Sequence, residues 1–324
     1  MLIISKTEIQ AHYSISDAIK DIKLGLDAKK SGKIVNPHRT VISLPKYQAS
    51  SLYMPSADLS SDIASIKVVS IFPENPKQGK KTTQGVLLLT DAATGEHICM
   101  MDASYLTRLR TGALSAIATD KLARANAKIL GIIGTGAMAF EQVMGVLAVR
   151  ELEKIVLYNR TLEKAVRFKT NLLASGVDIP VRVVNRSKEI VQVADIIICS
   201  TRSHEPVFAG KDLQPGTHIN GIGSFLPSMR EVDLVTIKRA TQIVVDDLSS
   251  AKEEAGELIY AEKQSDFNFW DIVGELMDYE LLSRSSDDEI TFFKSVGSAY
   301  FDLVVATGIY KKAILLSCGQ IVEI

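Results

Sequence analysis

The segment Lys128-Ile-Leu-Gly-Ile-Ile-Gly-Thr-Gly-Ala-Met-Ala139 decides the fold of this chain. An apolar run typical of a buried strand leads directly into closely spaced glycines, and a helical pattern follows. Gly134 permits a tight turn, Gly136 lets the backbone approach a pyrophosphate, and the small Ala139 lets the helix pack closely on the strand. An ordinary strand-to-helix turn is the alternative. The segment predicts a dinucleotide-binding turn if the neighbouring sequence has the matching pattern.

The sequence around this turn has the pattern of a doubly wound parallel sheet. Residues 137–149 have apolar side chains at helical spacing, and residues 154–158 form a β-rich run that completes a strand–helix–strand unit. Three further runs are typical of buried parallel strands: residues 194–201, 217–223 and 243–247. Ligands in such sheets bind at the carboxyl ends of the strands, so Ser200, Thr201 and Gly223 are expected to line the cofactor crevice.

The end of the second strand indicates which dinucleotide is preferred. NAD-preferring chains usually have an acid there for the ribose hydroxyl, whereas this chain has Asn159, Arg160 and Thr161. The Arg160 guanidinium can bind a phosphate, and the Thr161 hydroxyl can donate to one. Alternatively, Arg160 is an ordinary solvent-exposed arginine at the start of a helix and binds no phosphate. We therefore expect NADP(H) to be preferred, with NAD(H) possible.

Composition excludes several classes of protein. With 324 residues, 46% hydrophobic, 23% charged and a formal net charge of −1, the chain is expected to be a globular protein of two domains. It has no basic run suited to nucleic acid, no apolar run of about 20 residues that could span a membrane, and no signal-peptide pattern, so the cytoplasm is expected. The cysteines and histidines lack metal-site spacing, and the acidic run at residues 286–289 reads as a solvated loop, so no metal is expected.

The two ends of the chain predict a second, α+β domain. The N-terminal part begins with an amphipathic helix from Ser16 and continues with several strands, and a long helical pattern at residues 104–125 leads into the dinucleotide-binding turn. Residues 298–316 are again helical and apolar. We expect residues 1–124 with 299–324 to form a discontinuous substrate-binding and dimerisation domain, and residues 125–298 to form a Rossmann-type NAD(P)-binding domain.

Seven motifs give the chain a resemblance to a known family over nearly its whole length. These motifs are residues 51–55, 66–68, 79–82, 102–113, 128–139, 220–223 and 286–297. Through them the chain resembles the ornithine cyclodeaminase and mu-crystallin family. Within this family, the patterns at residues 104–115, 157–161 and 223–227 are similar to those of the bacterial Δ1-pyrroline-2-carboxylate reductases. This resemblance implies a dimer built on the first domain.

The resemblance also implies how a substrate carboxylate is bound. The family's three cationic ligands fall on Arg39, Lys67 and Arg110 in this sequence. Buried cationic donors in fixed geometry suit a small anion, and a guanidinium can bind a carboxylate through two parallel bonds. A lysine in an apolar strand pattern is unusual in its own right, because lysine is rarely buried unpaired. The alternative for Lys67 is an edge-strand lysine that points to solvent.

The remaining site residues that the resemblance implies contact the dinucleotide. Arg110 is included among the cofactor residues, and Thr82, Ser295 and Val296 are expected near the nicotinamide. The resemblance places Gly134, Thr135, Gly136, Ala137 and Met138 at the pyrophosphate, Asn159 and Arg160 at the adenosine ribose, and Thr201 also at the cofactor. Thr161, Ser200 and Gly223 are expected to contact the cofactor because of their positions at strand ends.

Phe225 is the departure from the family pattern that indicates the reaction. Ornithine cyclodeaminases have a catalytic Asp at the matching position, and phenylalanine cannot act as an acid or base. Ser224 could partly substitute. Reduction of a preformed cyclic imine needs orientation of the ring and neutralisation of its carboxylate, and Phe225 would offer an apolar wall. The expected activity is NAD(P)H-dependent reduction of Δ1-pyrroline-2-carboxylate to L-proline, with Lys67 and Arg110 as catalytic residues.

Two alternatives stay open at this point. One is a related amino acid reaction, namely ornithine cyclodeamination or an alanine dehydrogenase-like reaction. The other is a non-catalytic NADP-linked binding protein of the mu-crystallin type. The expected partners are a small carboxylate-bearing imine or amino acid and a second copy of the chain, without nucleic acid or membrane.

Overall fold

The chain folds into two compact units in the computed structural model, which describes residues 1–323. The first unit combines Met1–Arg110 with the C-terminal stretch from Ser298, and the second is Thr111–Gly297. Helix α3 (Ala103–Leu122) contributes residues to both. The predicted domain borders at 124/125 and 298/299 stay a prediction.

The second unit contains a parallel sheet in the order β10-β9-β8-β11-β12-β15-β13-β14. Its elements are β8 (Ile129–Ile133), α4 (Ala139–Leu147), β9 (Lys154–Tyr158), α5 (Leu162–Ala174), β10 (Val181–Val183), α6 (Lys188–Val191), β11 (Ile196–Cys199), β12 (His218–Gly221), α7 (Leu234–Arg239), β13 (Gln242–Val245), α8 (Leu248–Glu254), α9 (Gly256–Glu262), β14 (Val273–Glu275) and β15 (Thr291–Lys294). All neighbouring pairs are parallel. The chain reverses its direction of strand addition between β8 and β11, which makes the carboxyl ends of these two strands the expected ligand position.

Burial explains why these strands pair in parallel. β11 and β12 are both buried along their whole length. β11 is apolar on both faces, as expected for a strand covered on both sides, whereas β12 buries His218 and Asn220, which hydrogen-bond to the hydroxyls of Thr291 and Thr119. Two separate hydrophobic clusters lie on the two faces of the sheet, one containing Ile133, Ile197 and Phe292 and the other containing Ile132 and Ile198. The predicted Rossmann-type α/β fold is confirmed.

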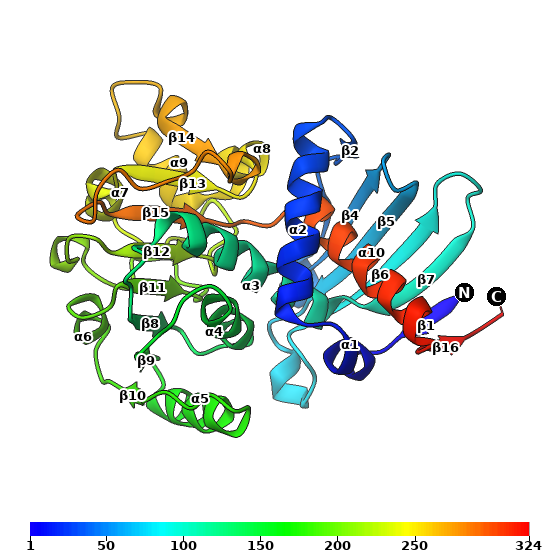
Figure 1. Cartoon of the computed structure of the whole chain (residues 1–324), viewed down its shortest axis with the longest axis horizontal. Helices are drawn as coiled ribbons and strands as arrows, with labels where there is room; N and C mark the ends of the chain where they lie inside the picture. Colours follow the sequence, from blue (N-terminus) through cyan, green and yellow to red (C-terminus); the bar gives the residue numbers. More distant parts are fainter. Residues whose placement is uncertain (324) are drawn as a thin grey trace. The chain divides into compact units, whose positions relative to one another are not determined.

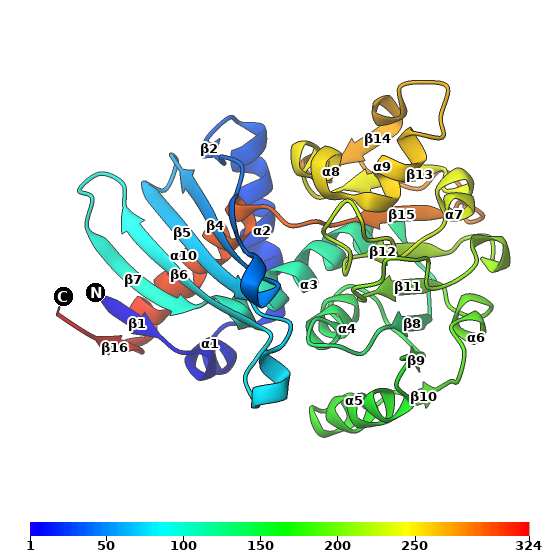
Figure 2. The same cartoon turned by 180° about the vertical axis from the view of Figure 1, so that it is seen from behind.

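The first unit is an eight-stranded mixed sheet with helices on one face. Its elements are β1 (Leu2–Ile4), α1 (Lys6–His12), α2 (Ile15–Lys30), β2 (Ile34–Val35), β3 (Thr40–Leu44), β4 (Ala49–Asp58), β5 (Ile63–Ile71), β6 (Thr83–Asp91), β7 (His97–Asp102), α10 (Ala299–Leu316) and β16 (Gln320–Ile321). The strand order is β16-β1-β7-β6-β5-β4-β2, with β3 beside β4. Helices α2 and α10 cover one face, whereas β4 to β7 lie in front of α10 in the opposite view (Figures 1 and 2).

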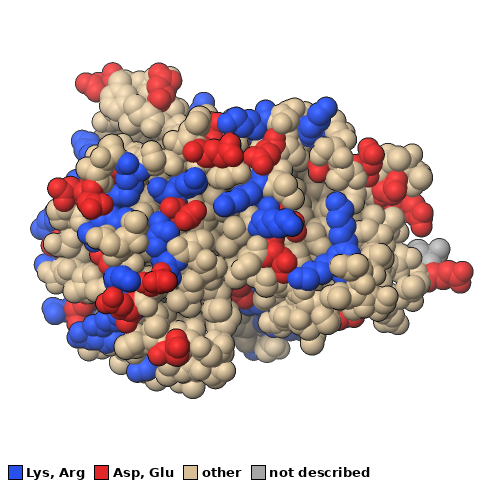
Figure 3. Space-filling model, in the orientation of Figure 1, with Lys and Arg blue, Asp and Glu red and all other residues tan. Residues whose placement is uncertain are grey.

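Surface and helix properties agree with the composition. Positive and negative side chains are mixed on the face drawn in Figure 3, as a net charge of −1 would suggest. Among residues 1–323, no helix is both long and apolar enough to cross a membrane.

Candidate functional site

The turn after β8 has the geometry that a dinucleotide requires. Gly134 has a φ of 96°, and a Cβ built on it would lie 2.7 Å from Thr201 Cγ2 and 2.9 Å from the Ser200 carbonyl oxygen. A residue with a side chain would be strained here both by its backbone conformation and by its neighbours. Ser200 Oγ donates to the Gly134 carbonyl at 2.6 Å. The predicted strand ends at Ser200 and Thr201 therefore do meet the turn.

The next residues leave room for a phosphate group. A Cβ built on Gly136 would meet nothing within 4 Å, and Ala137 beside it is exposed. Thr135 Oγ1 is buried and makes no hydrogen bond to any described residue. An open backbone segment and an unsatisfied hydroxyl before helix α4 fit a bound pyrophosphate, which would contact this backbone and fill the space beside Gly136.

The end of β9 is tied to the same turn. Asn159 Oδ1 accepts a hydrogen bond from Thr135 N at 3.1 Å, and its amide nitrogen donates to the Thr161 carbonyl at 3.0 Å. Arg160 and Thr161 are exposed at the start of α5, and Met138 is half-buried at the start of α4. The structure thus brings Asn159 to the turn and leaves Arg160 accessible at the carboxyl edge of the sheet.

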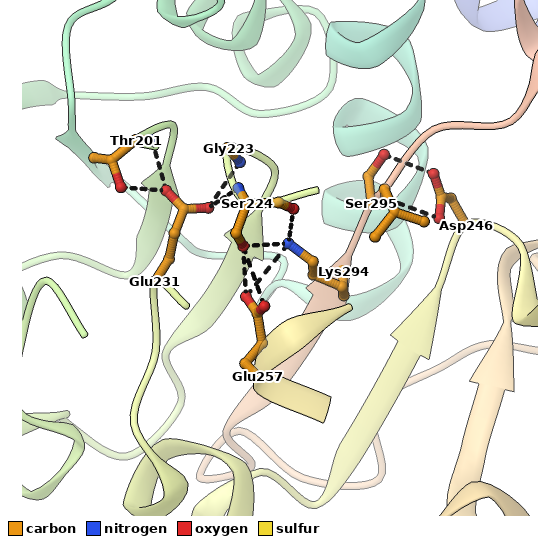
Figure 4. A network of polar contacts seen from close by, with 9 residues as sticks. Thr201, Gly223, Ser224, Glu231, Asp246, Glu257, Lys294 and Ser295 are labelled. Carbon is orange, nitrogen blue, oxygen red and sulfur yellow. Dashed lines mark hydrogen bonds and ion pairs between the residues drawn. The ribbon is translucent and has the colours of Figure 1, made fainter. Parts of the chain in front are cut away.

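A buried glutamate joins the ends of β11 and β12 (Figure 4). Glu231 Oε1 accepts from Thr201 N at 2.6 Å and from Thr201 Oγ1 at 2.8 Å. Its Oε2 accepts from Gly223 N at 2.7 Å and from Ser224 N at 3.2 Å. Burial raises the pKa of this carboxyl, against the effect of nearby Lys294. Glu231 holds the two strand ends that were predicted to line the crevice.

Ser224 belongs to a second buried network. Its Oγ lies 3.0 Å and 3.1 Å from the two oxygens of Glu257, and Lys294 Nζ donates to its Oγ and carbonyl oxygen, both at 2.6 Å. Glu257 and Lys294 are an ion pair at 3.3 Å with fully buried side chains. Ser224 is itself 0% exposed, so it is placed to join β12 to β15 rather than to replace a catalytic acid. Phe225 next to it is half-buried, with the Arg202 guanidinium 5.8 Å from the centre of its ring.

Ser295 and Val296 are held by a third buried acid. Asp246, after β13, accepts from Ser295 Oγ at 2.7 Å, from Val296 N at 3.2 Å and from Gly297 N at 2.8 Å. The hydroxyl hydrogens of Ser200, Thr201 and Ser295 are therefore used within the protein. Toward a ligand, these oxygens can act only as hydrogen-bond acceptors.

Lys67 lies in the middle of the first unit's sheet, not at an exposed edge. Its cross-strand neighbours on β4 and β6 are Met54 and Leu87, and all three are buried on the face covered by α10. Lys67 is 3% exposed, and its Nζ lies 2.5 Å from Oδ2 of Asp302 on α10. The alternative of a solvent-facing lysine is therefore wrong.

Arg110 reaches the same carboxylate from helix α3. Its Nε lies 3.2 Å from Asp302 Oδ1, and the Arg110 side chain is 7% exposed. Burial lowers the pKa of Lys67 to about 8; Asp302 opposes this, while Arg110 and Arg39 lower it further. Burial would raise the pKa of Asp302, but the charges of Lys67 and Arg110 hold it below its ordinary value. Two cations thus share one carboxylate, with the half-buried Arg39 nearby.

The predicted residues are divided between the two units. Arg39, Lys67 and Arg110 belong to the first unit, and so does Thr82, which is half-buried before β6. The dinucleotide-turn residues, the strand-end residues and Phe225 belong to the second. Among the described residues, no group of three His, Cys, Asp or Glu side chains could hold a metal, and the three cysteines are unpaired.

Asp302 and Glu231 are not predicted from the sequence. Asp302 follows Tyr300 and Phe301 in an apolar helix, and a lone acid in such a context is a recognisable signal because a buried charge needs a partner. Glu231 stands in a polar loop and carries no comparable signal.

Comparison with known proteins agrees with this arrangement. Residues 1–315 match the ornithine cyclodeaminase/mu-crystallin family. This chain belongs to the ornithine cyclodeaminase/mu-crystallin family. The family fold accounts for both units, since the match extends from the first strand into α10.

Relatives of this family member cover its whole length. It is 40% identical over 326 residues to a Δ1-pyrroline-2-carboxylate reductase of Bacillus cereus, with 100% of both chains covered. The solved structure of Thermococcus litoralis Δ1-pyrroline-2-carboxylate reductase with NADH and L-proline has a TM-score of 0.93, with 34% identity and coverage of 99% and 100% of the two chains. An archaeal alanine dehydrogenase dimer with bound NAD has a TM-score of 0.90, with 30% identity and coverage of 100% and 99%.

Proposed function

We propose that this family member is an NAD(P)H-dependent reductase that converts Δ1-pyrroline-2-carboxylate into L-proline. The observation that carries the proposal is the buried group of Lys67, Arg110 and Asp302. Among residues 1–323, Lys67 and Arg110 both pair with the single carboxylate of Asp302, so this group of three side chains has a net positive charge, which the carboxylate of a small substrate would neutralise. The similarity to Δ1-pyrroline-2-carboxylate reductases supports the choice of substrate.

Each residue has a distinct part in the proposed reaction. Arg39, Lys67 and Arg110 bind the substrate carboxylate, and Phe225 provides an apolar wall for the ring. A bound NAD(P)H would supply the hydride. Lys67 donates the proton that the ring nitrogen gains, because its pKa of about 8 suits proton donation near neutral pH. Thr82, Ser295 and Val296 orient the nicotinamide, and Arg110 also contacts the cofactor.

Competing amino acid reactions make different demands on the chain. Cyclodeamination needs a group that moves protons on the substrate amines, and Phe225 cannot do this. Ser224 does not replace it, because its hydroxyl is fully buried between Glu257 and Lys294. A binding protein without catalysis would not need a buried proton donor beside two further cations.

We propose NADP(H) as the preferred cofactor on the residues of this chain alone. The solved relatives hold NADH or NAD. Here the end of β9 has no acid that would repel a 2′-phosphate, and the exposed Arg160 can bind one with Asn159 and Thr161 beside it.

We also propose a homodimer, with the uncovered face of the first unit's sheet as the interface. Register places Pro55, Ile66, Leu88 and Met100 in one cross-strand row on that face. The neighbouring row includes Val86, which is 47% exposed. A contiguous apolar sheet face suits a second copy of the same chain, and a structural relative is a dimer. The cytoplasmic location stays a prediction.

The test is turnover by the purified protein. NADPH oxidation is followed with Δ1-pyrroline-2-carboxylate, and L-proline is identified as the product. No oxidation under conditions in which the imine is present would refute the proposal. Rapid ammonia release from ornithine with NAD would favour cyclodeamination instead.

A further inference from the structure

Asp302 is a buried carboxylate within an apolar helix, so it needs partners that offset the cost of burying its charge. It lies in the first turn of α10 and is 0% exposed, with the buried Phe301 and Leu303 on either side in the sequence. The positive end of the helix dipole favours a carboxylate there, but only by a fraction of the cost of burying a charge. The partners of Asp302 must offset the rest.

The two oxygens of Asp302 are divided between two cations. Oδ2 accepts from Lys67 Nζ at 2.5 Å, and Oδ1 accepts from Arg110 Nε at 3.2 Å. Each cation comes from a different element, β5 or α3, so the carboxylate fixes both against α10. Because Lys67 has three ammonium hydrogens and Asp302 takes one, the others remain for a ligand.

We propose that Asp302 is a positioning residue that keeps the Lys67 ammonium charged and directed at the substrate, and so sets the alkaline limit of imine reduction. This inference rests on the proposed function. In the proton step, an N–H bond of Lys67 breaks and an N–H bond forms on the ring nitrogen. A bound NAD(P)H would supply the hydride that the adjacent carbon gains. The neutral amine of Lys67 stays beside Asp302 and regains a proton from solvent.

The charges that face Lys67 come from three places in the first unit. Asp302 on α10 stabilises the ammonium, whereas Arg110 on α3 and Arg39 between β2 and β3 destabilise it. Apolar Met54 and Leu87 flank it within the sheet. Of the groups named here, Asp302 favours the ammonium, whereas burial and the two guanidinium groups favour the neutral amine. Loss of the Asp302 charge must therefore move deprotonation of Lys67 to lower pH.

The experiment compares pH profiles of the full-length enzyme and Asp302→Asn. The kcat/KM for Δ1-pyrroline-2-carboxylate with saturating NADPH is measured from pH 6 to pH 10. The wild type is expected to lose activity through about pH 8, and the variant to lose it at least about one pH unit lower, which is a further tenfold loss on the alkaline side. Ionisation of the imine itself affects both proteins equally, so the difference reports the enzyme.

Two further variants make the result decisive. Asp21→Asn removes a different partly buried carboxylate of the first unit, which accepts from Tyr13 OH at 2.6 Å, and should leave the alkaline limit unchanged. Lys67→Arg, whose guanidinium stays charged throughout, should abolish the limit near pH 8 in whatever activity remains. This second variant tests whether Lys67 is the group that titrates, whereas Asp302→Asn and Asp302→Glu test whether the Asp302 charge sets the pH at which it does so.

The outcomes separate this inference from the proposed function. An active wild type whose limit is unmoved in Asp302→Asn, or persists in Lys67→Arg, would overturn the role of Asp302 and leave imine reduction standing. Absence of imine reduction by the wild type would overturn both. Rescue of the profile by Asp302→Glu would support the charge as the cause.

Discussion

Replacement of Gly136 by alanine should weaken cofactor binding and leave the fold intact. The added Cβ would meet nothing within 4 Å, and Gly136 is not among the glycines with positive φ, so alanine fits without strain. In the proposed complex, however, the pyrophosphate lies against this backbone. The methyl group would occupy the space through which the phosphate approaches.

The expected loss follows from the hydrogen bonds that the phosphate would make. A bond from a backbone N–H to a charged group contributes about 1.5–3 kcal/mol, so displacement from two such donors costs at least about 3 kcal/mol. At 1.4 kcal/mol per factor of ten, this corresponds to a Kd for NADPH about 100-fold higher. NADPH at 100 times the wild-type Kd would stabilise the wild type by about 2.7 kcal/mol but Gly136→Ala by only about 0.4 kcal/mol.

Fluorescence titration with NADPH and thermal unfolding with and without NADPH measure the two quantities. Gly134→Ala is the matched control, because its Cβ would contact Thr201 and the Ser200 carbonyl and its φ is 96°. That variant should be destabilised without any ligand, with overpacking alone costing about 1–3 kcal/mol. Wild-type affinity for NADPH in a folded Gly136→Ala would refute the assignment of this turn to the pyrophosphate.

Three other perturbations test separate parts of the molecule. Arg160→Ala should reduce kcat/KM with NADPH by about 10-fold to 100-fold, as expected for one charge-assisted bond to phosphate, and leave NADH kinetics unchanged; equal losses with both cofactors would contradict a 2′-phosphate contact. Glu231→Gln directs an amide NH₂ toward backbone N–H groups that are themselves donors, so the free energy of unfolding, measured by urea titration, should fall by about 1–3 kcal/mol. A fall of less than about 0.5 kcal/mol would show that the hydrogen bonds of Glu231 to the ends of β11 and β12 contribute little to stability. Val86→Glu should convert the proposed dimer into a monomer, measured by light scattering, whereas Val166→Glu, at a similarly exposed valine on α5, should not; a dimer that persists in Val86→Glu would contradict the proposed interface.

Local sequence patterns were sufficient for the nucleotide-binding fold. The strand at 129–133, the turn at Gly134 and the helix from Ala139 are consecutive, and each depends on backbone conformation and nearest neighbours. Repetition of buried apolar runs then indicated a parallel sheet, because strands covered on both faces cannot alternate. The sequence also showed that no acid stands at the end of β9, because the strand–helix–strand unit fixes where that strand end lies relative to the glycine turn.

The residues that complete the candidate site come from distant parts of the chain. Lys67 and Asp302 are 235 positions apart, and Arg110 and Asp302 are 192 apart. No periodicity connects them, and family resemblance supplied Lys67 and Arg110 without their partner. Similarly, Glu231 lies in a loop with no sequence signal, and its role becomes visible through the hydrogen bonds that its carboxylate accepts from Thr201 N and Gly223 N.

The sequence by itself therefore determined the parallel sheet and the glycine turn between β8 and α4, and it predicted dinucleotide binding at this turn and, through resemblance, a set of cations for a carboxylate. Only the tertiary structure decided that Lys67 is buried, that it shares Asp302 with Arg110, and that Ser224 is committed to Glu257 and Lys294. The physical reason is the distance along the chain over which each interaction acts. Strands and turns form through interactions between adjacent residues. The charge state of a buried group depends instead on the side chains that lie within a few ångströms of it, and sheet register and helix packing decide which these are.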